Sequence, residues 1–282
     1  MNRPSTLRLL ACQISIPAMI TRHQRDAHLA LSAQKVSEAL EISSVDLVVL
    51  PELSSIDYSR ETFDNIDELS EPLDGPSYHC WRAVAQKHNC TISYSFARRE
   101  GDKTYICIAV IDGNGVSIGH YDKIHLAQYG ASMEKDYFTR GNHLFTFTVN
   151  GINLAPIICY DIRIPELSRV LTLDHKVDLI LHCGAYFRDE SFNTWHSFAI
   201  TRAIENQVFF LSLNRAGKNY GHSVFCRPWM DENTEAEQFA VHDEEFRLIE
   251  IDLSERDLAR EKYAFLKDKL GSYKLPVLKK VP

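Results

Sequence analysis

Three side chains able to take part in catalysis each follow an apolar, strand-like run of the sequence. Glu52 follows a run that ends at Leu50, and Lys123 and Cys159 follow two later runs. Strand ends in layered α/β folds gather along one edge of a sheet, where active sites form. An acid, a cation and a thiol that meet there would suit attack of sulfur on an acyl carbon. The carboxylate would transfer protons and the ammonium would stabilise the oxyanion.

The thiol of Cys159 lies where an apolar strand gives way to a helix start. Residues 156–158 are apolar, and Pro165 suits a first helical turn because its missing N–H costs nothing there. Backbone N–H groups and the helix dipole at such a junction favour a thiolate. The alternatives are structural: Cys159 as a buried small hydrophobe, Glu52 as a cap or surface acid, and Lys123 as a solvated loop lysine.

The elements that would position these residues alternate between strands and helices, without a linker or a repeat. The predicted strands cover residues 7–14, 46–50, 91–98, 104–111, 116–121, 144–149, 152–158, 177–183, 208–214 and 246–253. The predicted helices cover residues 24–41, 76–88, 165–173 and 192–205, with a last helix near residue 254. Asn150-Gly151 is a strong hairpin signal, whereas residues 53–72 read as loop with at most one helical turn. This order favours one α/β domain of two packed sheets with helices outside.

The composition excludes several classes of protein. A net charge of −7 argues against a general nucleic-acid or anionic-membrane binder. The first residues lack the apolar run of a signal peptide, and no stretch approaches a membrane span. The seven cysteines form no CxxC pair and no metal-ligand pattern, which suits reduced thiols in a cytosol. We therefore expect a soluble cytoplasmic protein without a metal or cofactor.

Several short motifs follow one another between about Leu7 and about Leu253. They are Leu50-Pro51-Glu52, Tyr121-Asp122-Lys123-Ile124-His125-Leu126, Cys159-Tyr160-Asp161-Ile162-Arg163-Ile164-Pro165-Glu166-Leu167, residues 202–207, Asn214-Arg215, and Gly221-His222-Ser223 followed by Pro228. These motifs in this order resemble the nitrilase, or carbon–nitrogen hydrolase, superfamily. The form of the motif around Cys159 is similar to the amidase and carbamoylase branches of that superfamily.

The resemblance implies a role for each matching residue. Glu52 would be the general base, and Lys123 would hold the oxyanion together with the backbone N–H of Tyr160. Glu134 matches a second glutamate of the family that would orient Lys123 and the substrate or water, although a plain loop acid is the alternative. The implied fold is a four-layer α-β-β-α sandwich. It would form one domain over residues 1–266, with a tail at 267–282 that reaches the partner in a homodimer or higher homo-oligomer.

Other residues are expected to support the site. Tyr160, Tyr186 and Phe187 are candidates for lining the acyl side of the pocket, although aromatic residues at such positions are as often core. We expect His125 to make structural hydrogen bonds and Arg163 to form an ion pair with Glu166. Two segments depart from the family pattern, residues 127–131 and 227–230, and both are expected to shape the pocket.

The favoured reaction is hydrolysis of a small linear carboxamide to a carboxylic acid and ammonia through a thioester. The alternatives within the superfamily are an N-carbamoyl amino acid or ureidopropionate-type amidohydrolase and, less favoured, a nitrilase. The alternative outside catalysis is a silent binding protein that has kept the fold.

Overall fold

The computed structural model describes residues 5–277, which form two six-stranded sheets. The first has the order β12-β1-β2-β3-β4-β5 and the second the order β11-β10-β9-β8-β7-β6. The strands of the first are β1 (Thr6–Gln13), β2 (Leu47–Val49), β3 (Thr91–Glu100), β4 (Lys103–Ile111), β5 (Ser117–Asp122) and β12 (Glu245–Asp252). Those of the second are β6 (Phe147–Val149), β7 (Ile152–Ile158), β8 (Leu179–Cys183), β9 (Phe209–Leu213), β10 (Val224–Cys226) and β11 (Glu237–Gln238).

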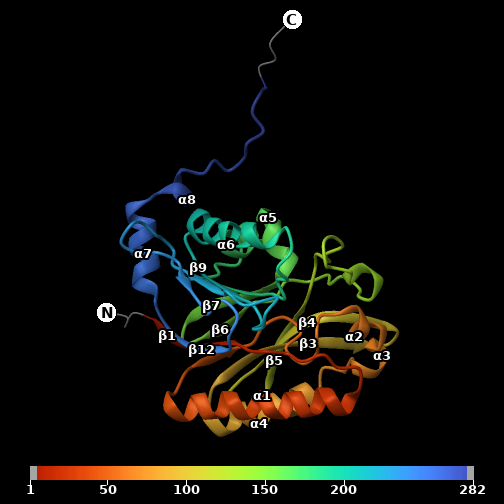
Figure 1. The fold of residues 1–282 in the computed structure, drawn as a ribbon. Helices are drawn as coiled ribbons and strands as arrows, with labels where there is room; N and C mark the ends of the chain where they lie inside the picture. The colour runs from red at the N-terminus through yellow and green to blue at the C-terminus, as the bar shows by residue number, and fades with distance from the viewer. Residues whose placement is uncertain (1–4, 278–282) are drawn as a thin grey trace, which may run out of the picture.

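Helices cover the outer face of each sheet (Figure 1). The pair α1 (Arg22–Ile42) and α4 (Pro76–His88) covers the first sheet, and the pair α5 (Pro165–Leu173) and α6 (Phe192–Asn206) covers the second. The chain is thus a four-layer α-β-β-α sandwich, which confirms the predicted fold. Helix α1 begins earlier than predicted because Thr21 and Gln24 form a capping box. The stretch predicted as loop holds two short helices, α2 (Arg60–Asp64) and α3 (Ile66–Leu69).

The parallel strands at the centre of each sheet aim their carboxyl ends at one edge. Strands β1, β2 and β3 are parallel in the first sheet, as are β7, β8 and β9 in the second. Their side chains are buried on both faces; Leu47, Val48, Val49, Ile157 and Ile158 are all fully buried. The segments that follow β2, β5, β7 and β8 therefore emerge from a rigid core close to one another.

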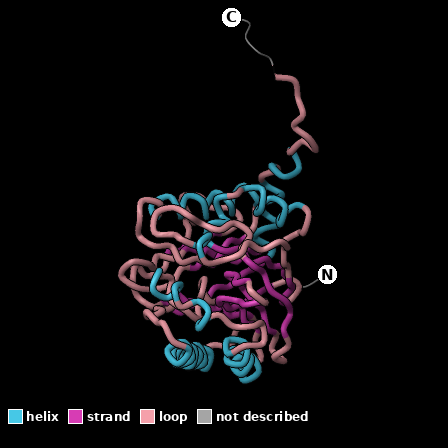
Figure 2. The backbone as a smooth tube through the Cα atoms, turned by 90° about the vertical axis from the view of Figure 1, so that its right-hand side faces the viewer, coloured by secondary structure: helices cyan, strands magenta, loops and turns pink. Residues whose placement is uncertain are grey.

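The C-terminal part of the chain leaves the sandwich. After α7 (Leu253–Lys262) and α8 (Phe265–Asp268), residues 269–277 lead away from the body (Figures 1 and 2). The predicted boundary at residue 266 falls within α8. Residues 278–282 of the predicted tail lie outside the described residues, so its reach to a partner stays a prediction. Within residues 5–277, no helix is both long and apolar enough to cross a membrane.

Candidate active site

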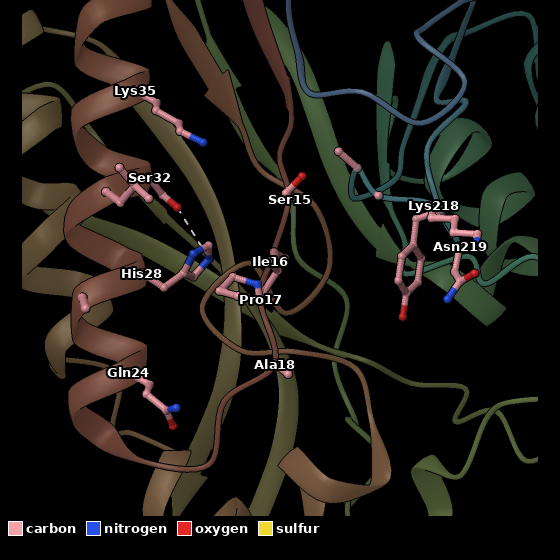
Figure 3. A pocket seen from close by; sticks show the side chains of 15 residues that line it. Ser15, Ile16, Pro17, Ala18, Gln24, His28, Ser32, Lys35, Lys218 and Asn219 are labelled. Atoms are coloured by element: carbon pink, nitrogen blue, oxygen red, sulfur yellow. Dashed lines mark hydrogen bonds between the residues drawn. The ribbon is translucent and has the colours of Figure 1, made fainter.

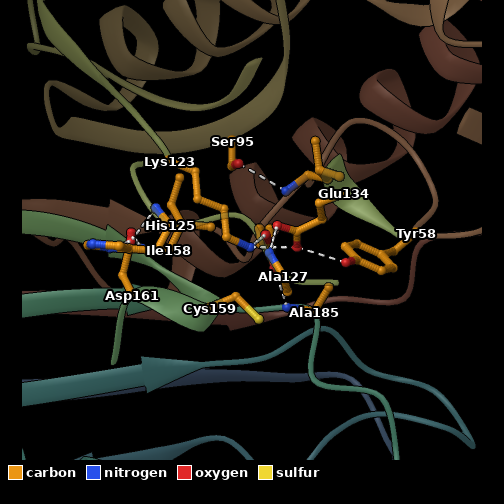
Figure 4. A network of polar contacts seen from close by, with 12 residues as sticks. Tyr58, Ser95, Lys123, His125, Ala127, Glu134, Ile158, Cys159, Asp161 and Ala185 are labelled. Atoms are coloured by element: carbon orange, nitrogen blue, oxygen red, sulfur yellow. Dashed lines mark hydrogen bonds and ion pairs between the residues drawn. The ribbon is translucent and has the colours of Figure 1, made fainter. Parts of the chain in front are cut away.

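Cys159 lies at the point where β7 ends and a short 3₁₀ turn, η2 (Cys159–Arg163), begins. Its φ of 44° is in the left-handed region, which a residue with a Cβ seldom adopts without support. Support comes from Asp161, whose Oδ2 accepts from the backbone N–H of Ile158 at 2.9 Å and from the hydroxyl of Tyr121 at 2.7 Å. His125 contacts the other oxygen of Asp161 through its backbone N–H and ring Nδ1 (Figure 4), in keeping with the structural role predicted for it.

The ammonium of Lys123 lies between two carboxylates. Its Nζ is 2.7 Å from Oε1 of Glu52 and 2.6 Å from Oε1 of Glu134, and all three side chains are fully buried (Figure 4). Each carboxylate has further donors. Glu52 accepts from the backbone N–H of Ala185 at 2.8 Å, and Glu134 accepts from that of Ala127 at 2.8 Å. Burial of three charged groups is tolerated because each one is hydrogen-bonded and paired.

The turn that carries Glu52 is fixed by a buried arginine. Nη2 of Arg215 donates to the carbonyl oxygens of Glu52 at 3.0 Å and Leu53 at 3.3 Å, and its Nη1 lies 3.2 Å from Asp57. Leu53 has a φ of 46°, and its N–H donates to the hydroxyl of Ser95. The backbone after β2 is therefore held in a conformation that it would not adopt alone.

The electrostatics of the cluster favour a charged lysine and a basic glutamate. Burial acts to lower the pKa of Lys123, but the charges of Glu134 and Glu52 outweigh it and raise that pKa well above its usual range. Burial raises the pKa of Glu52, and the negative charge of Glu134 adds to this, although Lys123 works against it. A carboxylate with a raised pKa is a better proton acceptor than one in water.

The thiol of Cys159 is not a preformed thiolate. Burial raises its pKa well above the ordinary value, and the nearby charge of Glu52 raises it further, whereas Lys123 opposes the shift. The sequence-based expectation of a thiolate stabilised by a helix N-terminus is therefore wrong. The turn that follows is a single 3₁₀ turn, and its partial charge is weaker than full burial beside a carboxylate. A nucleophile at this position needs a base.

The three aromatic candidates for the acyl pocket occupy different environments. Tyr186 is buried, stacks on Trp195 with ring centroids 4.6 Å apart, and donates its hydroxyl to the carbonyl oxygen of Cys159 at 2.9 Å. Tyr160 is half-buried, with its ring 5.5 Å from that of Tyr129. Phe187 is half-buried and lies edge-on to Tyr220 at 5.6 Å. Their contact with a substrate stays a prediction.

The structure adds a group that sequence reasoning missed. The hydroxyl of Tyr58 donates to Oε1 of Glu134 at 2.7 Å (Figure 4), from a segment predicted as irregular loop. No spacing or motif singles out this tyrosine, because it is separated from Glu134 by 76 positions. Glu134 thus receives hydrogen bonds from Tyr58, Lys123 and Ala127, which fix both of its oxygens.

One expectation about supporting residues is wrong, and another stays a prediction. Among the described residues Arg163 forms no ion pair with Glu166. Its guanidinium lies over the rings of Phe198 at 5.0 Å and Tyr129 at 5.6 Å. In the segment 227–230, Arg227 pairs with Glu237 and Glu255, and Trp229 stacks on Tyr263 at 3.6 Å. A role of this segment in shaping the pocket stays a prediction. The segment after Lys123 borders the acid–lysine cluster, which consists of Glu52, Lys123 and Glu134, because the N–H of Ala127 donates to Glu134.

Within residues 5–277, one group of three side chains has the residue types and spacing of metal ligands, but an arginine side chain already contacts its carboxylate. His120, Asp122 and His143 lie close together. Both oxygens of Asp122, however, accept hydrogen bonds from Arg98, at 2.9 and 2.7 Å. A guanidinium at that carboxylate repels a metal ion, so the donor set does not favour metal binding.

A cavity of about 700 Å³ lies beside α1, apart from the acid–lysine cluster. It is bounded by α1 residues such as His28 and Lys35, by residues 15–18, and by residues 216–220 (Figure 3). Its lining includes none of Glu52, Lys123 and Cys159, although Tyr220 contacts both the cavity and Phe187. The cavity is therefore distinct from the cluster.

Comparison with known proteins establishes the family. The carbon-nitrogen hydrolase family profile matches residues 8–260. The chain belongs to this family, and the superfamily assignment made from the motifs, including its amidase side, is confirmed.

Two relatives are amidases. The chain is 35% identical over 196 residues to a 2-oxoglutaramate amidase of Bacillus subtilis, covering 67% of this chain and 73% of that protein. It is 26% identical over 251 residues to an (R)-stereoselective amidase of a Pseudomonas species, covering 87% and 88%. The chain is thus similar to amidases over most of its length.

Solved structures agree with the fold. A carbon–nitrogen hydrolase from Helicobacter pylori has a TM-score of 0.81 at 22% identity, over 94% of this chain and 95% of that one. Saccharomyces cerevisiae Nit3, a member of branch 10 of the nitrilase superfamily, has a TM-score of 0.78 at 22% identity, over 92% and 94%. At this identity the likeness concerns the fold alone.

Proposed function

We propose that this protein hydrolyses a small linear carboxamide to a carboxylic acid and ammonia through a thioester on Cys159. The observation that carries the proposal is the buried ammonium of Lys123, 2.7 Å from Glu52 and 2.6 Å from Glu134, at the sheet edge where Cys159 lies. The amidases among the relatives support an amide as substrate.

In the acylation step, Glu52 takes the proton of the Cys159 thiol as sulfur attacks the amide carbon. The raised pKa values of both groups support this assignment, because they favour a protonated thiol and a carboxylate that is a stronger base than in water. The carbonyl π electrons move to oxygen, where the Lys123 ammonium and the backbone N–H of Tyr160 stabilise the charge. The C–N bond then breaks, and Glu52 returns the proton to nitrogen, which leaves as ammonia.

In the deacylation step, water takes the place of ammonia. Glu52 removes a proton from the water as its oxygen attacks the thioester carbon, and the oxyanion forms at the same site. The C–S bond breaks, sulfur regains a proton from Glu52, and the acid is released. Glu134 keeps Lys123 in place throughout, since its own oxygens are held by Tyr58 and Ala127.

The experiment that tests the proposal is intact-mass measurement after brief mixing with a panel of amides, carbamoyl amino acids and nitriles. The panel includes 2-oxoglutaramate, because one relative is an amidase of that compound. An adduct that maps to Cys159, with ammonia and the acid as products, is the expected result. Carbon dioxide released with ammonia would identify a carbamoylase instead, and ammonia from a nitrile would identify a nitrilase.

The same panel separates an enzyme from a silent binding protein. Iodoacetamide should alkylate Cys159 before the other cysteines if this thiol is the nucleophile. Absence of any adduct together with an inert Cys159 would contradict the proposal and favour the binding protein.

A further inference from the structure

A line of buried hydrogen bonds ends on the carbonyl oxygen of Cys159. The indole N–H of Trp195 lies 2.7 Å from the hydroxyl of Ser212, which lies 2.6 Å from Nδ1 of His182. Nε2 of His182 lies 3.0 Å from the Cys159 carbonyl. All four residues are buried. The mechanism above uses none of the first three.

The donor and acceptor properties of the two end groups fix which atom donates in each hydrogen bond of this line. An indole N–H only donates and a backbone carbonyl only accepts, so the two ends are set. His182 must therefore carry a proton on Nε2, and a neutral ring then accepts at Nδ1 from the Ser212 hydroxyl. Ser212 accepts in turn from Trp195. Burial lowers the pKa of His182 to about 4, in keeping with a neutral ring. Each group in the line has one defined orientation.

The carbonyl at the end of the line belongs to the peptide that holds the proposed oxyanion donor. The Cys159 carbonyl and the Tyr160 N–H are the two ends of one planar trans peptide, so they point in opposite directions. Groups that donate hydrogen bonds to the Cys159 carbonyl oxygen therefore also fix the direction of the Tyr160 N–H. A hydrogen bond to a carbonyl also polarises its peptide and strengthens the N–H as a donor. The φ of 44° at Cys159 makes such a restraint necessary.

We propose that His182, held by Ser212 and Trp195, is a positioning residue that aims and polarises the Tyr160 N–H toward the oxyanion. This inference rests on the proposed function, because it assumes that a tetrahedral oxyanion forms beside Tyr160. Tyr186 donates to the same carbonyl at 2.9 Å and shares the task. Neither His182 nor Ser212 touches the acid–lysine cluster, so their effect passes through the peptide.

Two probes of Cys159 separate this role from a merely structural one. A substrate-like aldehyde forms a thiohemiacetal, whose oxyanion occupies the same site as that of the tetrahedral intermediate. Iodoacetamide alkylates the thiol by displacement of iodide and forms no oxyanion. Loss of an oxyanion donor therefore weakens the aldehyde and leaves alkylation unchanged. Loss of the local fold impairs both.

The test variant is His182→Leu, which keeps volume but cannot donate. Removing an oxyanion donor outright costs about 10²–10³ in kcat; here the donor stays but loses its restraint, so we expect a loss of about tenfold. The aldehyde should weaken by the same factor, with little change in KM or in alkylation rate. His182→Gln can donate and accept, and should recover part of the loss.

The matched control is His28→Leu. His28 is also buried, and its Nε2 lies 3.0 Å from a backbone carbonyl, that of Ser54, so its removal has a similar structural cost. This control should lower thermal stability while leaving the ratio of aldehyde affinity to alkylation rate as in the wild type. If His182→Leu does not fold, His182→Phe provides a flat ring without a donor for the same readouts.

Two results would overturn the inference: parallel loss of aldehyde affinity and alkylation in the His182 variants, or no loss of either. Failure of the proposed function is seen separately, in the wild type. There it would appear as absence of acyl adducts and of aldehyde inhibition.

Discussion

Two neighbouring residues, Asp122 and Lys123, enter two buried ionic clusters with opposite character. Asp122 accepts two hydrogen bonds from Arg98, and both side chains are only 4% exposed. This pair has one cation and one acid in a closed, bidentate contact. Lys123 is fully buried with two acids, Glu52 and Glu134, so that cluster carries one negative charge in excess.

The difference between the clusters explains why one suits chemistry and the other suits stability. In the balanced pair, burial alone would lower the pKa of Arg98, but the hydrogen bonds and charge of Asp122 more than reverse this and raise that pKa above its usual range. In the unbalanced cluster, burial and the second acid raise the pKa of Glu52, which makes it able to accept a proton. A proton acceptor inside a protein thus requires an acid that its cation does not fully neutralise.

The largest expected effect comes from removing the thiol of Cys159, whose proton Glu52 accepts in the proposed mechanism. Cys159→Ala should lower kcat by about 10⁴-fold or more, because no covalent intermediate can form. The loss of one sulfur atom should leave the fold intact. Steady-state turnover and thermal unfolding check this. Substantial turnover in a folded variant would show that the thiol is not the nucleophile.

Glu52→Gln removes the negative charge in excess in the cluster of Glu52, Lys123 and Glu134, and tests Glu52 as the base. The glutamine keeps an oxygen for the 2.7 Å contact with Lys123 but cannot accept a proton, so we expect kcat to fall by about 10³-fold. Thermal unfolding serves as the control for an intact fold. Near-normal turnover would contradict the role of Glu52 as base.

The local part of the fold was predictable because it depends on residues close in sequence. Asn150-Gly151 predicted a hairpin, and both residues have the positive φ that this turn requires, 50° and 79°. Helix α5 runs from Pro165 to Leu173, as predicted, because proline suits its first turn. The stretch that holds the short helices α2 and α3 was predicted as loop with one helical turn at most, since each helix is too short for a hydrophobic period.

The candidate site was only partly predictable, for a physical reason. Strand ends indicated Glu52, Lys123 and Cys159, but the partners that set their chemistry are distant in sequence. The N–H of Ala185 reaches Glu52 across 133 positions, and Tyr58 reaches Glu134 across 76. Burial also raises the pKa of the Cys159 thiol, whereas the sequence led us to expect a thiolate. The position of a cysteine before a helix start does not reveal how strongly its side chain is desolvated.

The balanced pair should respond in stability rather than in rate. Arg98→Met leaves Asp122 buried without its cation, which should cost about 3 kcal/mol of unfolding free energy. Arg98→Lys keeps the charge but loses the bidentate fork and should cost less. Denaturant unfolding measures both variants. A large fall in kcat for the folded Arg98→Met protein, without loss of stability, would show that the two clusters are not separate in function.

A smaller effect is expected in the pH profile of Glu134→Gln. The negative charge of Glu134 raises the pKa of Glu52, so its removal should lower that pKa. Glu52 acts as a base only when deprotonated, and the acidic limb of the kcat/KM profile should therefore move to lower pH, by about one unit or less. The structurally separate variant Arg98→Lys serves as control and should leave the limb in place. A shift to higher pH would contradict the electrostatic assignment.

The smallest effect is expected from metal removal. This experiment tests whether the Asp122–Arg98 pair and the histidines beside it bind a metal ion that turnover requires. His120 and His143 lie beside Asp122, but Arg98 already holds both oxygens of that carboxylate. We therefore expect turnover to stay unchanged after dialysis against a chelator. If activity were lost and returned with added zinc, His143→Asn would locate the ion. Sensitivity to the chelator in the wild type but not in that variant would show that a metal at the Asp122 cluster controls turnover, and the division between the two clusters would no longer hold.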